Sequence, residues 1–329
     1  MSAAAAKQRV RVGAARLRSL ILGLLAVVTA AAACACTTGE DQPKIVVTTN
    51  ILGDITREIV GDEAEVTVLM QPNADPHSFG LSAVQAAQLE RADLVVYNGL
   101  GLEENVLRHV DAARESGVAT FAAGEAADPL TFHAAGDGGP AGEEGQRDPH
   151  FWTDPDRVRK AAGLMADQVV EHVEGVDEGA IRANADHYDR QLKDLTTWME
   201  TSFDRVPEDR RALVTNHHVF GYLADRFDFQ VIGAVIPSGT TLASPSSSDL
   251  RSLTVAMRRA GVRTVFADSS RPARLAEVLR GELGGQVQVV ELYSESLTAK
   301  GQGADTYLRM MRANTTAMTD GLTAAAGAD

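Results

Sequence analysis

The sequence predicts an α/β protein of two lobes, each with a four-stranded parallel sheet flanked by helices, joined by one long rigid helix. Three observations lead to this fold class. The chain has 329 residues, more than one hydrophobic core usually serves. Short apolar runs alternate with helical patterns in two similar halves, which is typical of parallel sheets covered on both faces. A long amphipathic pattern lies between the halves.

Residues 1–36 are predicted to be a lipoprotein-type signal peptide and anchor region outside the fold. A basic stretch precedes the apolar run 20–28 and an alanine tract, and the only two cysteines, Cys34 and Cys36, follow there. We expect Cys34 or Cys36 to carry a lipid, against the alternative of a plain secretory signal. The protein would then be exported and anchored to the outer face of the cytoplasmic membrane, with no disulfide in the mature domain.

The first lobe is predicted over residues 42–178, where β-rich runs and helical stretches alternate. Strands are expected at 44–49, 65–70, 93–97 and 118–121. Helices are expected at 51–60, 82–92, 104–116 and 156–174. Asp154 is the expected N-cap of the last of these helices, with Pro155 at its first helical position.

The linking helix is predicted over 179–203, and the second lobe over 208–326. A helix of about 25 residues spans about 37 Å, so we expect a strut between the lobes and not a surface helix of the first lobe. Strands of the second lobe are expected at 212–215, 230–235, 264–267 and 287–291. Its helices are expected at 219–226, 248–260, 273–283 and 305–325.

Side chains that can bind a metal ion fall near the expected strand ends. His77 follows the second strand, the pair His217 and His218 follows the first strand of the second half, and Glu295 follows the last strand. His150 ends the loop before the inter-lobe helices. Because ligands bind beyond the carboxyl ends of parallel strands, we expect these positions to meet in one cleft between the lobes. Adjacent side chains rarely face one ion together, so one of the paired histidines is expected to lie outside the first coordination sphere.

Three imidazoles and one carboxylate predict a site for Zn²⁺, with Mn²⁺ or iron(II) as the less favoured ions. Four protein ligands leave no position for an activated water, which favours a protein that holds metal and is no enzyme. A zinc hydrolase with Glu295 as general base, and a surface adhesin with a structural metal, are the alternatives. The net charge of −14 argues against a nucleic-acid partner.

The sequence also contains a series of motifs in a fixed order. They are DPHSF (75–79), NGLGLE (98–103), DPHFWTDP (148–155), HHVFGY (217–222), LYSESL (292–297) and TYLRMM (306–311). With these motifs the chain resembles the metal-binding receptors of bacterial zinc and manganese ABC importers, the ZnuA/TroA-like periplasmic family, and looks nearest to its AztC-type zinc lipoproteins. The resemblance covers about residues 44–322.

The resemblance implies a ligand set. His77 and His150 match the first two ligands of the family, and His217 matches the third, with His218 where an Asp is common. Glu295 stands where the fourth ligand is commonly Asp. The loop before the second ligand often carries many histidines in zinc receptors, whereas here it holds only His133.

The resemblance also implies partners for the receptor. An ABC importer permease with its cytoplasmic ATPase would receive the metal, a metallochaperone is a further candidate partner, and a monomer is expected. Asp75, Asp148 and Asp268, together with His218, are candidate second-shell residues that could orient the ligands.

Overall fold

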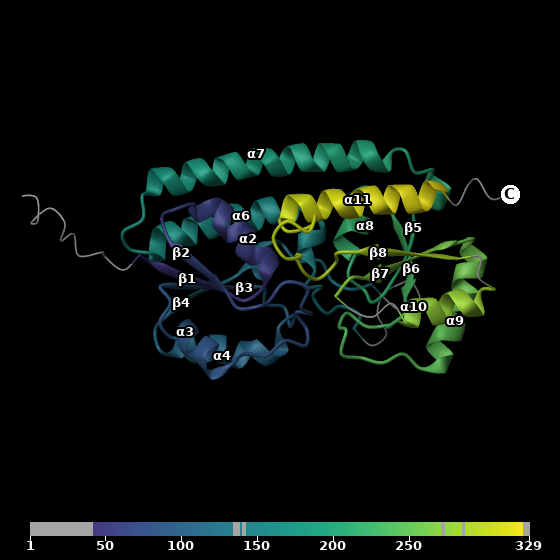
Figure 1. Cartoon of the computed structure of the whole chain (residues 1–329), viewed down its shortest axis with the longest axis horizontal. Helices are drawn as coiled ribbons and strands as arrows, with labels where there is room; N and C mark the ends of the chain where they lie inside the picture. Colours follow the sequence, from purple (N-terminus) through teal and green to yellow (C-terminus); the bar gives the residue numbers. More distant parts are fainter. Residues whose placement is uncertain (1–41, 134–138, 140–142, 271–273, 285–286, 325–329) are drawn as a thin grey trace, which may run out of the picture. The chain divides into compact units, whose positions relative to one another are not determined.

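Two parallel four-stranded sheets form the framework of the computed structural model, which describes residues 42–133, 139, 143–270, 274–284 and 287–324. The predicted signal region, with Cys34 and Cys36, lies outside these residues. The first sheet has the order β2-β1-β3-β4, and the second has the matching order β6-β5-β7-β8 (Figure 1). The strands are β1 (Lys44–Val47), β2 (Glu65–Val68), β3 (Leu94–Tyr97), β4 (Ala119–Ala122), β5 (Ala212–Thr215), β6 (Gln230–Ala234), β7 (Thr264–Asp268) and β8 (Gln288–Leu292). The predicted fold class is confirmed.

Helices cover both faces of each sheet. In Figure 1, α2 and α6 lie on one face of the first sheet, and α3 and α4 lie on the other. The helices are α2 (Asn50–Val60), α3 (Ala83–Leu89), α4 (Glu104–Glu115), α5 (Ala123–Ala126), α6 (Pro155–His172), α7 (Glu178–Phe203), α8 (Gly221–Phe227), α9 (Ser247–Ala260), α10 (Arg274–Glu282) and α11 (Tyr307–Ala324). None of these described helices is both long enough and apolar enough to cross a membrane.

Local signals define several helix ends. Asp154 caps α6, its side chain accepting a hydrogen bond from the backbone of Asp156, and Pro155 occupies the first helical turn. Ser246 and Asp249 form a reciprocal capping box at the start of α9. Both ends agree with the expectation from sequence, because each depends only on residues within one turn of the cap.

Alternate residues of each strand enter different cores. In β1, Ile45 and Val47 join the core beneath α2 and α6, whereas Val46 joins the core that faces α3 and α4. In β7, Phe266 joins the first of these cores, and Val265 joins a core beneath α9 and α10. Because successive side chains of a strand point to opposite faces, the all-apolar strands read from the sequence are buried on both sides.

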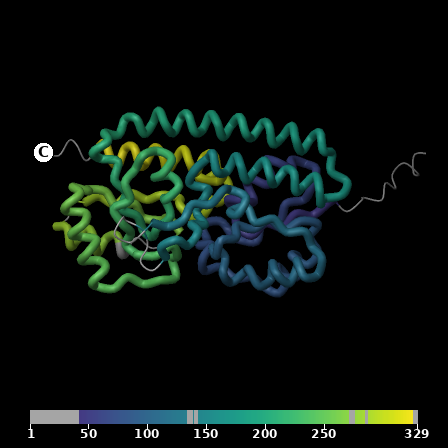
Figure 2. The backbone as a smooth tube through the Cα atoms, turned by 180° about the vertical axis from the view of Figure 1, so that it is seen from behind, coloured from purple at the N-terminus to yellow at the C-terminus, as the bar shows by residue number. Residues whose placement is uncertain are grey.

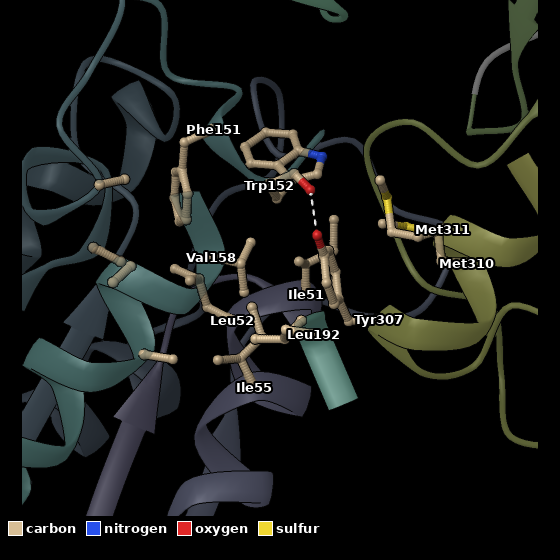
Figure 3. Packing of buried hydrophobic residues seen from close by; sticks show 14 of the residues in the cluster. Ile51, Leu52, Ile55, Phe151, Trp152, Val158, Leu192, Tyr307, Met310 and Met311 are labelled. Atoms are coloured by element: carbon tan, nitrogen blue, oxygen red, sulfur yellow. Dashed lines mark hydrogen bonds between the residues drawn. The ribbon is translucent and has the colours of Figure 1, made fainter. Parts of the chain in front are cut away.

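One hydrophobic core is continuous between the lobes. It contains residues of α2, α6 and α7 together with Leu213, Phe266 and the methionines of α11. Figure 3 shows Ile55 and Leu192 in this core, and near them Tyr307, whose hydroxyl donates a hydrogen bond to the Trp152 carbonyl at 2.8 Å. The helix α7 extends along both lobes (Figure 2), in contact with α2, α6 and α11. Because residues 43–329 form one compact unit, the lobe boundaries at 42–178, 179–203 and 208–326 stay a proposal.

Candidate metal centre

Four side chains meet at the carboxyl ends of the strands. His77 follows β2, His217 follows β5, Glu295 follows β8, and His150 precedes a short 3-10 helix at Phe151–Thr153. One donor atom from each of the four lies within 4.8 Å of the others, and all four residues are buried. The topology therefore brings both lobes and the segment between them to one point.

The spacing of the donor atoms fits a single small ion. His77 Nε2 lies 3.4 Å from His150 Nε2, and His217 Nε2 lies 3.0 Å from Glu295 Oε1. The Glu295 carboxylate is 3.7 Å from the Nε2 atoms of both His77 and His150. A tetrahedral ion with bonds of about 2.0–2.1 Å separates its ligand atoms by about 3.3 Å. The four atoms can therefore share one zinc-sized ion after shifts of a few tenths of an ångström.

The tripeptide Asp-Pro-His occurs twice and folds in the same way at both histidines. Asp75 Oδ1 accepts the backbone N–H of His77 at 2.9 Å, and Asp148 Oδ1 accepts that of His150 at 2.9 Å. Each aspartate bonds the backbone two residues ahead, which is an Asx turn. The turn fixes the backbone from which each imidazole projects.

Asp148 also orients the imidazole of His150. Its Oδ1 atom lies 2.7 Å from His150 Nδ1, which leaves Nε2 facing the other donors. Burial, with the nearby His217, holds the pKa of His150 well below its usual value, and burial raises the pKa of the Asp148 carboxyl to about 7. The shared cause is exclusion of water, which disfavours an uncompensated charge. The pocket thus keeps His150 in the neutral form that binds a metal.

Residues of α8 hold the Asp148 segment in place. The Tyr222 hydroxyl donates to the Asp148 carbonyl at 2.6 Å and accepts the Leu130 N–H at 3.0 Å. A Cβ atom on Gly221 would meet Asp148 Oδ2 at 2.7 Å, so only glycine leaves room for the carboxylate. The third and second ligand motifs are therefore fitted to each other.

Both lobes hold the segment that carries Glu295. The Trp152 indole N–H donates to the Ser294 carbonyl at 2.8 Å, and Ser294 Oγ donates to the Asp268 carboxylate. On the other side, Asn50 of α2 donates to Ser296 Oγ at 2.7 Å. Asp268 therefore acts on the backbone beside Glu295 and has no printed contact with an imidazole of the site.

His218 lies outside the cluster of four. Its backbone N–H donates to the Ser238 carbonyl at 3.0 Å, and its side chain lines a neighbouring cavity with Phe132 and Asp148. Burial and the positive ends of two nearby imidazoles lower the pKa of His218 to about 4. The structure thus brings His217, and not His218, to the other three donors.

Sequence reasoning overlooked a buried carboxylate beneath the His150 turn. Glu103 accepts hydrogen bonds from Thr48 Oγ1 at 2.8 Å and from the backbone of Asn98 at 2.7 Å. Asn98 in turn donates to the Pro149 carbonyl at 3.0 Å. Burial raises the pKa of Glu103, although these hydrogen bonds oppose the shift. The motif NGLGLE contained this signal, but its role depends on a contact 51 residues away.

A two-lobed α/β protein with a buried site of three imidazoles and one carboxylate, at the carboxyl ends of both sheets, belongs to the class of metal-binding receptors. The chain matches the family described as ZnuA, zinc-uptake complex component A periplasmic, over residues 45–321. The chain belongs to this family. It is a substrate-binding receptor of the kind that serves metal ABC importers, and not an enzyme.

Relatives and solved structures agree with the family. The manganese-binding lipoprotein MntA of Bacillus subtilis is 29% identical over 294 residues, which cover 86% of this chain and 90% of MntA. The zinc-binding protein TroA of Treponema pallidum is 27% identical over 300 residues, covering 90% of this chain and 94% of TroA. The structure of periplasmic TroA from the same organism superposes with a TM-score of 0.75 at 25% identity, covering 85% of this chain and 99% of TroA. The predicted family is confirmed.

Proposed function

We propose that this chain is an extracytoplasmic receptor that captures Zn²⁺ with His77, His150, His217 and Glu295 and delivers it to an ABC importer permease driven by a cytoplasmic ATPase. The observation that carries the proposal is the spacing of the four donor atoms, 3.0–3.7 Å between the measured pairs. This spacing fits a four-coordinate ion. The receptor would be exported and lipid-anchored through Cys34 or Cys36, as several relatives are named lipoproteins.

The donor set supports zinc over manganese. Three of the four donors are imidazole nitrogens, which suit Zn²⁺, whereas Mn²⁺ prefers sites that are richer in oxygen and have more ligands. The names of the relatives do not separate the two ions, because MntA is named for manganese and TroA for zinc. Chemistry at this site is therefore the argument for zinc.

The buried setting supports capture. Neutral imidazoles and one carboxylate give the pocket about one negative charge, and a divalent ion replaces its hydration shell with four donors already in place. No donor has to travel far, so little conformational free energy is lost on binding. A metallochaperone that loads the site, and a monomeric receptor, are further parts of the proposal.

The test is a competitive titration of the purified protein with Zn²⁺ and Mn²⁺ against a chromophoric chelator. We expect one Zn²⁺ per chain and much weaker Mn²⁺ binding. His77→Ala, His150→Ala, His217→Ala and Glu295→Ala should each weaken zinc binding by more than about a hundredfold, since loss of a mere outer-shell partner costs ten- to a hundredfold.

Two control variants make this test decisive. His187→Ala changes an exposed histidine of α7 and should leave affinity unchanged. His218→Ala should have a smaller effect than His217→Ala. Tighter binding of Mn²⁺ than of Zn²⁺ would instead favour a manganese receptor, and a larger effect of His218→Ala would overturn the assignment of the third ligand.

A further inference from the structure

The second Asp-Pro-His turn is braced within its own segment, but the first reaches across to the other lobe. Asp75 Oδ1 holds the backbone of His77, and Asp75 Oδ2 accepts a hydrogen bond of 2.6 Å from Thr241 Oγ1. Both Asp75 and Thr241 are buried, with 8% and 2% of their surface exposed. One carboxylate therefore links the His77 turn to a residue 166 positions away.

Thr241 belongs to a short irregular segment after β6, residues Ser238–Thr241, which we call the clasp. The Ser238 carbonyl accepts the backbone N–H of His218, the residue next to His217, at 3.0 Å. The clasp thus connects the turn that presents His77 with the turn that presents His217.

A second carboxylate holds the other end of the clasp. Glu143 accepts hydrogen bonds from Ser238 Oγ at 2.6 Å and from the Gly239 N–H at 3.0 Å. A Cβ atom on Gly239 would meet Phe132 Cζ at 2.5 Å and Glu143 Oε2 at 2.7 Å, so the close approach requires glycine. Because its backbone is held on both sides, the clasp can present the Thr241 hydroxyl in a fixed direction.

The lobes themselves are poorly suited to separate. The core that they share runs through α2, α7 and α11, and Asp54 of α2 accepts the backbone N–H of Tyr307 at 2.7 Å. Opening the lobes would expose this apolar surface to water. Exchange of the ion should therefore depend on contacts close to the ligands.

We propose that Thr241 is a positioning residue for metal capture, whose hydroxyl holds the Asp75 carboxylate and thereby the His77 turn in its ligand-presenting arrangement. Breaking the Thr241–Asp75 hydrogen bond is then the local step that lets His77 leave the ion. This inference rests on the proposed function, since it concerns the same four-donor site. It assigns to a threonine of the second lobe control over a ligand of the first.

The test is the rate at which the zinc-loaded full chain releases Zn²⁺ to excess 4-(2-pyridylazo)resorcinol, a chelator that changes colour on binding zinc. Thr241→Val keeps the shape of the side chain and removes the donor. We expect release to be about tenfold faster, within the range for a lost hydrogen bond to a charged group. Thr241→Ser restores the hydroxyl and should release zinc at nearly the wild-type rate.

Two comparisons separate positioning from general loosening. Thr240→Val alters the adjacent hydroxyl, which accepts from the Leu242 N–H, and should leave release unchanged. In an Asp75→Asn background, Thr241→Val should add less than it does alone, because the two residues act through one contact. If Thr241→Val does not fold, Thr241→Ala serves the same comparison.

Equal release rates for wild type and Thr241→Val would overturn the inference, as would equal acceleration by Thr241→Val and Thr241→Ser. Full additivity with Asp75→Asn would also overturn it. Each of these results requires a wild-type protein that binds zinc. A wild-type chain that binds no zinc would instead refute the proposed function.

Discussion

A single oxygen of Asp148 serves two nitrogens of His150, lying 2.9 Å from its backbone nitrogen and 2.7 Å from Nδ1. This arrangement fixes both the turn and the ring, so Nε2 is the ring nitrogen available to the ion. The histidine and its aspartate are only two positions apart, with a proline between them. The orientation of this ligand is thus encoded within three residues.

Replacing that aspartate should weaken zinc binding without unfolding the protein. For Asp148→Ala we expect a loss of about ten- to a hundredfold in affinity, because partners that orient a ligating histidine are typically worth that much. The measurement is chelator competition, with Asp111→Ala, which changes an exposed surface carboxylate, as the control. Unchanged affinity in Asp148→Ala would show that the ring is oriented by other contacts.

Two glycine substitutions should have opposite effects on stability. Gly221→Ala places a Cβ atom 2.7 Å from Asp148 Oδ2, so we expect lower affinity for zinc and a loss of roughly 1–3 kcal/mol in unfolding free energy. Gly163→Ala lies on the exposed side of α6 with no atom within 4 Å, and should stabilise the protein by about 0.5–1 kcal/mol. Urea unfolding of both variants tests the pair. A neutral Gly221→Ala would mean that the carboxylate has room to move.

The protein should remain folded when its metal is removed. The three hydrophobic cores are built from apolar side chains and do not depend on the four donors. We expect the chelated protein to keep its circular dichroism spectrum and a cooperative thermal transition, with Tm rising as Zn²⁺ is added, because ligand binding to the native state stabilises it. Unfolding on chelation would favour a structural metal, as in the adhesin hypothesis.

Much of this architecture could be predicted because it is encoded locally. The strand of residues 212–215 coincides with β5, and the caps at Asp154 and Ser246 depend on neighbours within a turn. The four donors were found at strand ends, and the shared topology of the two sheets brings them together. Periodicity and turn chemistry were sufficient at these positions.

Contacts between distant segments could not be predicted. Asn50 and Thr241 have no motif of their own, and each acts across more than a hundred positions. Asp268 was a candidate partner for an imidazole, but its contact is with Ser294. Such roles depend on how the second sheet meets the first, which periodicity does not encode. The nearer likeness to AztC-type receptors, and the lipidation of Cys34 or Cys36, stay predictions.

One buried acid should make stability depend on pH apart from metal binding. Burial raises the pKa of Asp54 from 3.8 to about 6, despite the hydrogen bond that its carboxylate accepts from the Tyr307 N–H. Between about pH 4 and 6 the folded protein therefore binds more protons than the unfolded chain at this site. The unfolding free energy should fall as pH rises through that window, by at most about 3 kcal/mol.

The variant Asp54→Asn isolates this contribution from the other buried acids. In metal-free protein, we expect its unfolding free energy to decline less steeply than that of wild type between pH 4 and 6. Denaturant unfolding at several pH values gives the two curves. Parallel curves would show that Asp54 has a similar pKa in the folded and unfolded states.

X-ray absorption at the zinc edge tests the central claim most directly, that donors from both lobes and the segment between them bind one ion. For zinc-loaded wild type we expect three imidazoles and one oxygen at about 2.0–2.1 Å. His217→Ala should remove one imidazole from the spectrum, and His218→Ala should remove none. A wild-type spectrum with fewer than three imidazoles, or one that loses an imidazole in His218→Ala, would contradict the account.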